Sequence, residues 1–96
     1  MREPLTPSEA RRTLSLLLAN RVGVVVFTSH ALEEMRFDGI TNPEAFAVLR
    51  FGQIFEPAEY ERGSWRYRVH RERVCVVCAF DTETKAVVVT AWRKQR

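Results

Sequence analysis

The last third of the chain contains three β-rich runs that are separated by only a few residues each. The runs are "WRYRVH", "RVCVVCAF" and "AVVVTAW", and the connections between them, "RER" and "DTETK", are short and polar. Connections this short join neighbouring antiparallel strands, because parallel strands need a crossover of about a dozen residues or more. The runs therefore predict an antiparallel meander, and a domain built on it must cover one face of the sheet to form a core.

Helix-start signals precede this sheet and predict three helices. The motif "TPSE" pairs an N-cap threonine with a glutamate three residues later, which predicts a helix from residue 7 to about residue 19 or 20. The motif "TNPE" repeats this signature and predicts a short helix through about Phe51. Between them, we expect "SHALEEMRF" to form the remaining helix, with Thr28 or Ser29 as its N-cap.

Two further runs, "RVGVVVF" and "QIFEP", are typical of short strands. We expect a single α+β domain over residues 1–96, with N-terminal helices packed on one face of a C-terminal antiparallel sheet of three to four strands. No apolar run approaches the roughly 18 residues that cross a bilayer. The start, "MREPLTPSEARR", lacks the apolar core of a signal peptide, so we expect a cytoplasmic protein.

The net charge of +3 hides an asymmetry between the two parts of the chain. Residues 1–61 carry six arginines against nine acids, whereas residues 62–96 carry seven arginines and two lysines against three acids. A basic, arginine-rich part with interleaved aromatic residues indicates a phosphate-binding surface. The alternative is that the arginines only decorate the solvated face of a sheet.

One strand concentrates the residues that could act on RNA. Side chains alternate along a strand, so Arg66, Arg68 and His70 share one face. Trp65, Tyr67 and Val69 share the other face, with Tyr67 toward the core. Arginine binds phosphate oxygens, and histidine exchanges protons near neutral pH. These are the groups that cleave RNA without a metal: a base activates the 2′-hydroxyl and an acid protonates the leaving 5′-oxygen. A solvated strand face remains the alternative.

The remaining candidates extend this hypothesis. His30 opens a helix, where the N-terminal backbone N–H groups favour phosphate, although a local hydrogen bond would explain it equally well. We predict that His30, Arg68 and His70 are catalytic, with no metal or other cofactor. The predicted RNA-binding residues are Arg66, Arg71, Arg73, Trp92, Arg93 and Lys94. Trp92 could instead pack at the end of its strand.

The "CVVC" motif, Cys75 to Cys78, lies inside a continuous apolar run. Residues three apart on a strand lie about 10 Å apart on opposite faces, too far for a disulfide. Zinc would need ligands that no second cysteine pair supplies. We therefore expect two small buried thiols.

Several motifs together resemble those of a widespread group of small bacterial proteins described as a domain of unknown function. The motifs are "FTSHALEEMRFDGIT", "EAFAVLRFGQIFE", "GSWRYRV" and "VVVTAW", which cover about residues 27–92. This group in turn looks like the MqsR and RelE-like toxins of type II toxin–antitoxin systems. Members of the group often carry arginine at two positions where this chain has Glu34 and Asp38.

The resemblance implies helices followed by an antiparallel sheet, and an endoribonuclease (mRNA interferase) activity. It also implies messenger RNA, possibly ribosome-bound, as the substrate and a cognate antitoxin protein as the partner. A non-catalytic module that binds RNA or protein on the same scaffold is the alternative function. A third hypothesis is an interaction protein whose basic sheet accepts an acidic peptide or an added strand.

Overall fold

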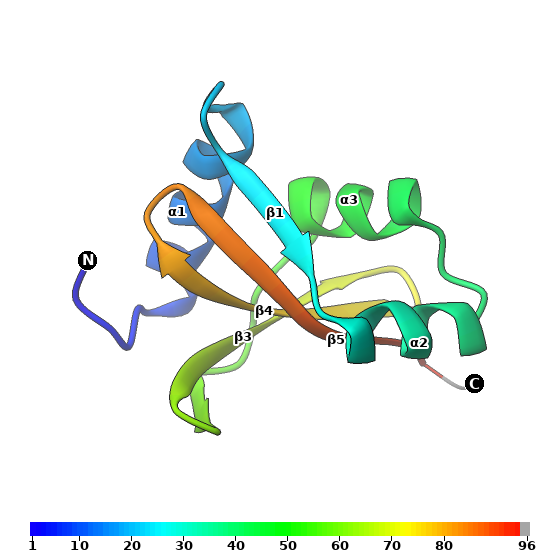
Figure 1. Ribbon diagram of the computed structural model, residues 1–96. Coiled ribbons are helices and arrows are strands. Elements are labelled where there is room, and N and C mark those ends of the chain that lie inside the picture. The colour runs from blue at the N-terminus through cyan, green and yellow to red at the C-terminus, as the bar shows by residue number, and fades with distance from the viewer. Residues whose placement is uncertain (95–96) are drawn as a thin grey trace.

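The computed structural model describes residues 1–94 and shows three helices and five strands (Figure 1). The elements in chain order are α1 (Pro7–Ala19), β1 (Val24–Phe27), α2 (Ser29–Phe37), α3 (Asn42–Phe51), β2 (Glu59–Glu61), β3 (Ser64–Arg71), β4 (Val74–Thr82) and β5 (Lys85–Arg93). The α+β class, the three helices and the β3–β4–β5 meander are confirmed. None of the described helices is long and apolar enough to cross a membrane.

Each helix begins directly after a threonine N-cap, and of the two cap candidates for α2 the structure has Thr28. The hydroxyl of Thr6 accepts a hydrogen bond from the Glu9 N–H at 3.2 Å, and the Glu9 carboxylate accepts one from the Thr6 N–H at 2.9 Å. Thr28 and Thr41 accept N–H groups at the starts of α2 and α3, at 3.0 and 3.2 Å. These side chains satisfy backbone donors that a helix end leaves without partners, which fixes where each helix begins.

The sheet differs from the predicted one in strand number and direction. Its order is β1-β5-β4-β3-β2, and β1 runs parallel to β5, so the sheet is mixed and has five strands instead of three or four. The strand β1 lies between α1 and α2 in the chain, and its pairing with β5 spans about sixty residues. No local sequence signal specifies a pairing over that distance.

The strand predicted at residues 53–57 is displaced along the chain. Gln53 makes only an isolated bridge to His70, and β2 instead forms a hairpin with β3. Arg62 and Gly63, the two loop residues, have φ values of 49° and 86°. Two consecutive left-handed residues make the type of turn whose twist matches a two-stranded hairpin, so this turn sets the position of β2.

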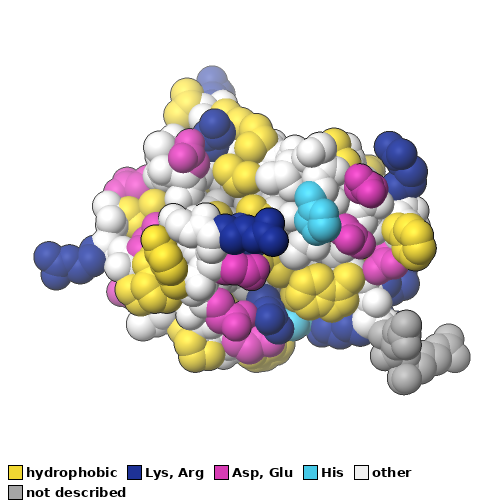
Figure 2. Space-filling model, turned by 60° about the horizontal axis from the view of Figure 1, so that its bottom comes forward, with side chains coloured by type: hydrophobic (Ala, Val, Ile, Leu, Met, Phe, Trp, Pro, Cys, Tyr) yellow, Lys and Arg dark blue, Asp and Glu magenta, His cyan; other side chains and the backbone are white. Residues whose placement is uncertain are grey.

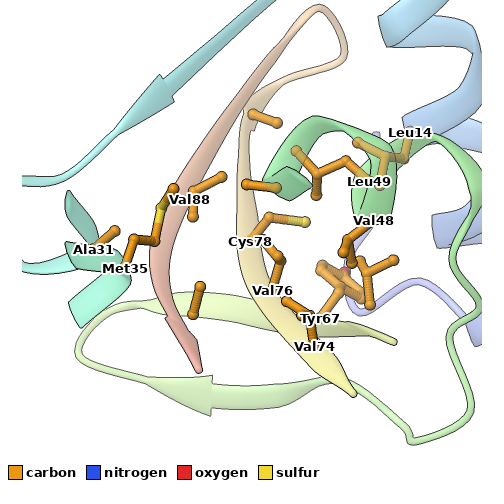
Figure 3. Close-up of a cluster of buried hydrophobic side chains, with 14 of the residues drawn as sticks. Leu14, Ala31, Met35, Val48, Leu49, Tyr67, Val74, Val76, Cys78 and Val88 are labelled. Atoms are coloured by element: carbon orange, nitrogen blue, oxygen red, sulfur yellow. The ribbon is translucent and has the colours of Figure 1, made fainter. Parts of the chain in front are cut away.

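The helices bury one face of the sheet. Figure 3 shows Leu14 of α1 together with Val48 and Leu49 of α3 beside Tyr67 and the β4 side chains, and all of these residues are buried. The prediction that all helices precede the sheet in the chain and pack on this face is only partly right. In Figure 1, α2 follows β1 directly and lies against the C-terminal half of β5, where Ala31 and Met35 are buried.

A bulge in β5 decides which residues of that strand face the core. The register shifts by one residue at Val89, because Val77 lies opposite Thr90 while the next residue, Cys78, lies opposite Val88. Val88 and Ala91 are therefore both buried in the core although they are three residues apart. Thr90 and Trp92 consequently lie on the opposite face, which no helix of the core cluster covers.

Both cysteines are buried and free, as expected. Cys78 belongs to the core under the helices, whereas Cys75 lies on the other face, directly between His70 of β3 and Trp92 of β5. Burial raises the pKa of Cys75 to about 11 and that of Cys78 to about 12. Thiols with such values stay protonated near neutral pH and are poor nucleophiles.

The junction between α3 and the sheet is closed by a residue of α1. Arg11 donates to the carbonyl of Leu49, and at 2.6 Å to that of Gly52. These are carbonyl groups at the C-terminal end of α3, which lack partners within the helix. Burial lowers the pKa of this half-buried guanidinium. Arg11 thus stabilises the turn at the end of α3, directly before Gln53 pairs with His70.

Candidate nucleic-acid interface

The predicted alternation along β3 is confirmed. Tyr67 and Val69 are fully buried in the core, whereas Arg66, Arg68 and His70 lie on the helix-free face and are partly exposed. The Tyr67 hydroxyl donates to the Glu3 carboxylate at 2.8 Å and accepts the Leu5 N–H at 3.0 Å. Tyr67 therefore fixes the N-terminal segment and does not take part in the candidate interface.

A groove on the helix-free face brings together three of the predicted RNA-binding and catalytic residues. Its volume is about 220 Å³, and we call it the arginine groove. The guanidinium of Arg68 lies 5.7 Å from the centre of the Trp92 ring. The groove is lined by Glu59, Glu61, Arg66, Arg68, Val77, Thr90 and Trp92. An indole beside two guanidiniums offers a stacking surface next to phosphate donors.

Carboxylates of the β2 hairpin pair with both arginines of the groove. Glu59 lies 2.9 Å from Arg68, and Glu61 lies 3.5 Å from Arg66. Figure 2 shows the same interleaving of basic and acidic side chains over the surface in view, with no broad basic patch. On this surface the charge asymmetry along the chain does not produce a basic patch, because acids from residues 1–61 pair with the arginines of β3.

His70 is held by a carboxylate. Its Nε2 lies 2.8 and 3.1 Å from the two oxygens of Glu56, and Nδ1 is buried without a partner among the described residues. Burial alone would raise the pKa of Glu56, but the hydrogen bond from His70 and the nearby Arg68 charge outweigh it and hold that pKa below its ordinary value. A charged Glu56 favours the tautomer of His70 that carries its proton on Nε2.

The depressed pKa of Glu56 makes a prediction for stability against pH. A carboxyl whose folded pKa lies below its unfolded value stabilises the fold fully above about pH 4.3, and this contribution disappears as the pH falls through the folded pKa. We expect Glu56→Gln to be less stable than wild type at pH 6, with a smaller difference at pH 3, where the wild-type carboxyl loses this contribution as it becomes protonated. Urea unfolding at both pH values measures it.

The exposed Glu33 on α2 supplies the matched control for this prediction. Glu33→Gln should unfold like wild type at both pH values, because within residues 1–94 no hydrogen bond ties its side chain to another element. A Glu56→Gln protein that keeps full stability at pH 6 would show that the contact with His70 does not hold the segment after α3 in place.

His30 lies apart from His70. It is the second residue of α2, its side chain is 66% exposed, and its Nε2 lies 3.8 Å from Glu34 one turn later. Two strands, β4 and β5, separate β3 from α2. The two predicted catalytic histidines therefore do not form one site.

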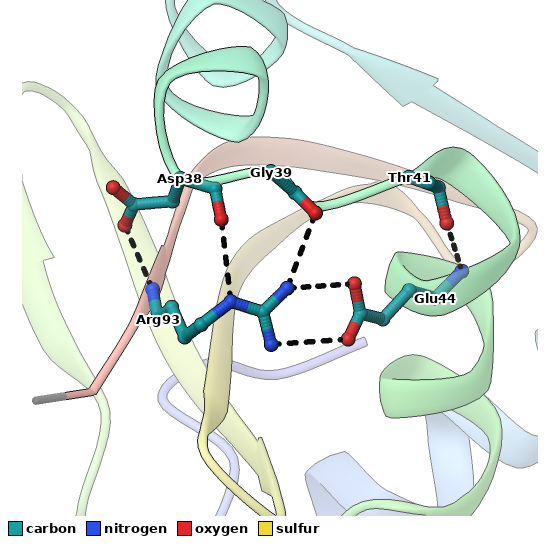
Figure 4. A network of polar contacts seen from close by, with 5 residues as sticks. All are labelled: Asp38, Gly39, Thr41, Glu44 and Arg93. Carbon is teal, nitrogen blue, oxygen red and sulfur yellow. Dashed lines mark hydrogen bonds and ion pairs between the residues drawn. The ribbon is translucent and has the colours of Figure 1, made fainter. Parts of the chain in front are cut away.

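Arg93 lies on the helix side of the sheet and contacts the turn between α2 and α3 (Figure 4). Its guanidinium donates to the carbonyl groups of Asp38 and Gly39, both at 3.2 Å, and to the Glu44 carboxylate at 3.0 and 3.3 Å. Its backbone N–H donates to the Asp38 carboxylate at 2.8 Å. The arginine predicted to bind RNA thus serves to hold two helices against β5.

The other predicted basic residues gather at the β3–β4 turn. His70, Arg71 and Lys94 line a second cleft of about 360 Å³. Arg73 accepts the Lys94 N–H through its carbonyl group at 2.6 Å. Within residues 1–94, no group of three or more His, Cys, Asp or Glu side chains is placed to hold a metal ion.

Sequence reasoning missed the acidic residues of this face. Glu56, Glu59 and Glu61 recur at short intervals just before the arginine-bearing strand, and this is the signal that could have revealed them. A short hairpin would bring such residues beside the strand that follows, as cross-strand pairs.

Comparison with protein-family models matches residues 27–93 to "Domain of unknown function (DUF4258)". The matched range runs from the last residue of β1 to the last residue of β5, and it includes the arginine groove. No curated protein and no solved structure matches the chain.

Proposed function

Since the chain belongs to the DUF4258 family, whose function is unknown, we propose from its own site that it is a metal-independent endoribonuclease of the RelE- and MqsR-like toxin type. The observation that carries the proposal is the arginine groove, in which Arg66, Arg68 and Trp92 meet on the helix-free face of the sheet. A guanidinium pair beside an indole matches the phosphate and the base of one unpaired nucleotide.

Three side chains divide the chemistry of the proposed reaction. Arg68 binds the scissile phosphate and stabilises the charge that develops on it. Glu59 lies 2.9 Å from Arg68, and its carboxylate takes the proton of the 2′-hydroxyl as that oxygen bonds to phosphorus. The bond from phosphorus to the 5′-oxygen then breaks. The products are a 2′,3′-cyclic phosphate and a free 5′-hydroxyl.

His70 is the proton donor that we assign to the leaving 5′-oxygen. It is the next side chain after Arg68 on the same face of β3, and its Nε2 carries the proton that Glu56 accepts in the free protein. When substrate displaces Glu56, the doubly protonated ring gives its Nε2 proton to the 5′-oxygen and keeps the proton on Nδ1, because a neutral imidazole does not release its remaining proton. His70 is a poor candidate for the base, because Nδ1 is buried and Nε2 is occupied.

The proposed substrate and partner follow from the resemblance of the sequence motifs to the MqsR and RelE-like toxins. Messenger RNA, free or ribosome-bound, supplies the unpaired strand, and a cognate antitoxin restrains the activity. An antitoxin that covers the helix-free face would supply acidic groups to Arg66 and Arg68 in place of phosphate.

We expect the purified chain to cleave single-stranded RNA in the presence of EDTA and to leave 2′,3′-cyclic phosphate ends. The same oligonucleotide with 2′-O-methyl groups should remain intact, because the attacking hydroxyl is blocked. Gel electrophoresis with end-group analysis measures both results. Cleavage that requires Mg²⁺, or that proceeds equally on the methylated strand, would contradict the mechanism.

The second candidate function is a non-catalytic module that binds RNA or protein. The pairing of both groove arginines with glutamates favours it, because a locally neutral surface also suits a protein partner with mixed charges. Binding of the oligonucleotide without any cleavage products, at concentrations where the RNA is fully bound, selects this function over the nuclease.

A further inference from the structure

Two exposed phenylalanines lie at the mouth of the second cleft. Phe51, at the end of α3, is 64% exposed, and Phe55, in the segment before β2, is 65% exposed. Both line the cleft of about 360 Å³ together with His70, Arg71, Glu72 and Lys94, and we call it the phenylalanine cleft. Exposed aromatic rings lose the benefit of burial, and two of them around one cleft mark a surface that takes a ligand.

The two rings are surrounded by basic groups. The guanidiniums of Arg50 and Arg71 each lie 5.6 Å from the centre of the Phe51 ring. The Phe55 ring centre lies 5.8 Å from that of His70. Lys94 adds a further positive charge, and Glu72, at 3.9 Å from Arg71, is the acidic group of the cleft. Aromatic faces flanked by cations favour an unpaired nucleobase and its phosphate.

The phenylalanine cleft adjoins the arginine groove along two strands. Arg68 and Trp92 line the groove, and the cleft contains His70 and Lys94. His70 is the next residue on the same face of β3, and Lys94 lies two residues after Trp92, just past the end of β5. Residues two apart on a strand are separated by about 6.6 Å. The two concave regions therefore follow one another in the direction of β3, as successive nucleotides of an extended strand would.

We propose that the phenylalanine cleft is a second nucleotide subsite, in which Phe51 and Phe55 stack on the base next to the one bound at Trp92. This inference rests on the proposed function, because it assumes RNA in the arginine groove. Single-stranded RNA then runs along β3, with Arg68 at the scissile phosphate and Arg71 and Lys94 at the next one. Cleavage consequently requires unpaired nucleotides on both sides of the cut.

The test is the affinity of a fluorescent 2′-O-methyl octanucleotide, which binds without being cut, measured by anisotropy. We expect Phe51→Ala and Phe55→Ala each to weaken binding roughly tenfold, in the range found when a base loses its aromatic platform. Phe55→Trp should retain the wild-type affinity, because the larger ring still stacks. Phe37→Ala is the matched control: this side chain is 89% exposed on α2, away from both concave regions, and its loss should change binding less than twofold.

The outcomes separate this inference from the proposed function. Circular dichroism first confirms that each variant is folded. If Arg68→Ala weakens binding but both phenylalanine variants bind like wild type, the second subsite is wrong and the nuclease proposal stands. If the phenylalanine variants bind weakly while wild type never cleaves unmodified RNA, the subsite stands and the nuclease is wrong. A wild-type chain that binds protein partners but no RNA overturns the subsite.

Discussion

Replacing Arg68 with alanine is expected to lower the rate of RNA cleavage at least a hundredfold, a loss typical of removing one preorganised donor from a transition state. Arg68 is the guanidinium that contacts both the acidic partner and the indole of the arginine groove. Its removal leaves the developing charge on phosphate without its nearest donor and frees Glu59 from its ion pair. Initial rates on a single-stranded oligonucleotide in EDTA measure the effect.

Two further variants identify the cause of that loss. Arg68→Lys should recover only part of the rate, because an ammonium keeps the charge but not the planar fork of donors. Arg36→Ala removes an exposed arginine of α2 and should cleave like wild type. All three proteins should unfold within about 1 kcal/mol of wild type, because exposed ion pairs stabilise proteins only weakly. An Arg68→Ala protein with the wild-type rate would remove the basis of the nuclease proposal.

Replacing Gly52 with alanine is expected to destabilise the protein by roughly 3 kcal/mol, at the upper end of the usual cost of overpacking. A Cβ at this position would lie 2.5 Å from the Val48 carbonyl oxygen and 2.7 Å from the His70 carbonyl oxygen. Both obstacles are backbone atoms, so neither can turn aside as a side chain would. Urea unfolding followed by circular dichroism gives the free energy of unfolding.

Gly63→Ala supplies the comparison for this prediction. Gly63 has a φ of +86° in the β2–β3 turn, and nothing lies within 4 Å of the Cβ that alanine would add. The cost there is the backbone strain of a left-handed alanine, about 1–2 kcal/mol. If Gly52→Ala proves as stable as Gly63→Ala, the end of α3 can move away from β3, and the position of His70 is less fixed than the contacts indicate.

Much of this fold could be predicted from local patterns. The capping threonines locate the helices, since a cap acts within three residues of itself. Strand alternation places Tyr67 in the core and Arg68 on the opposite face, since the two-residue period of a strand needs no distant partner. The burial of both cysteines follows from the continuous apolar run in which they lie, which is typical of a strand covered on both faces.

What could not be predicted depends on pairs of residues far apart in the chain. The parallel pairing of β1 with β5 joins residue 24 to residue 85. The bulge at Val89 becomes visible only when β5 is placed beside β4. The sequence contains arginines and glutamates in separate stretches, and only the β2 hairpin brings Glu59 beside Arg68. The sequence predicts RNA binding for Arg93 because it follows Trp92 in a basic segment, whereas its contact with Glu44, 49 residues away, leaves no local signal.

The arginine–glutamate pairs give this surface its own counterions. A phosphate that binds Arg66 or Arg68 displaces a carboxylate of the same chain, and that carboxylate then attracts dissolved cations which the RNA has released. Fewer ions are therefore set free overall than the number of arginines suggests. Affinity for a polyanion should fall gently with ionic strength, so the groove would discriminate between ligands chiefly through the shape and stacking of the base.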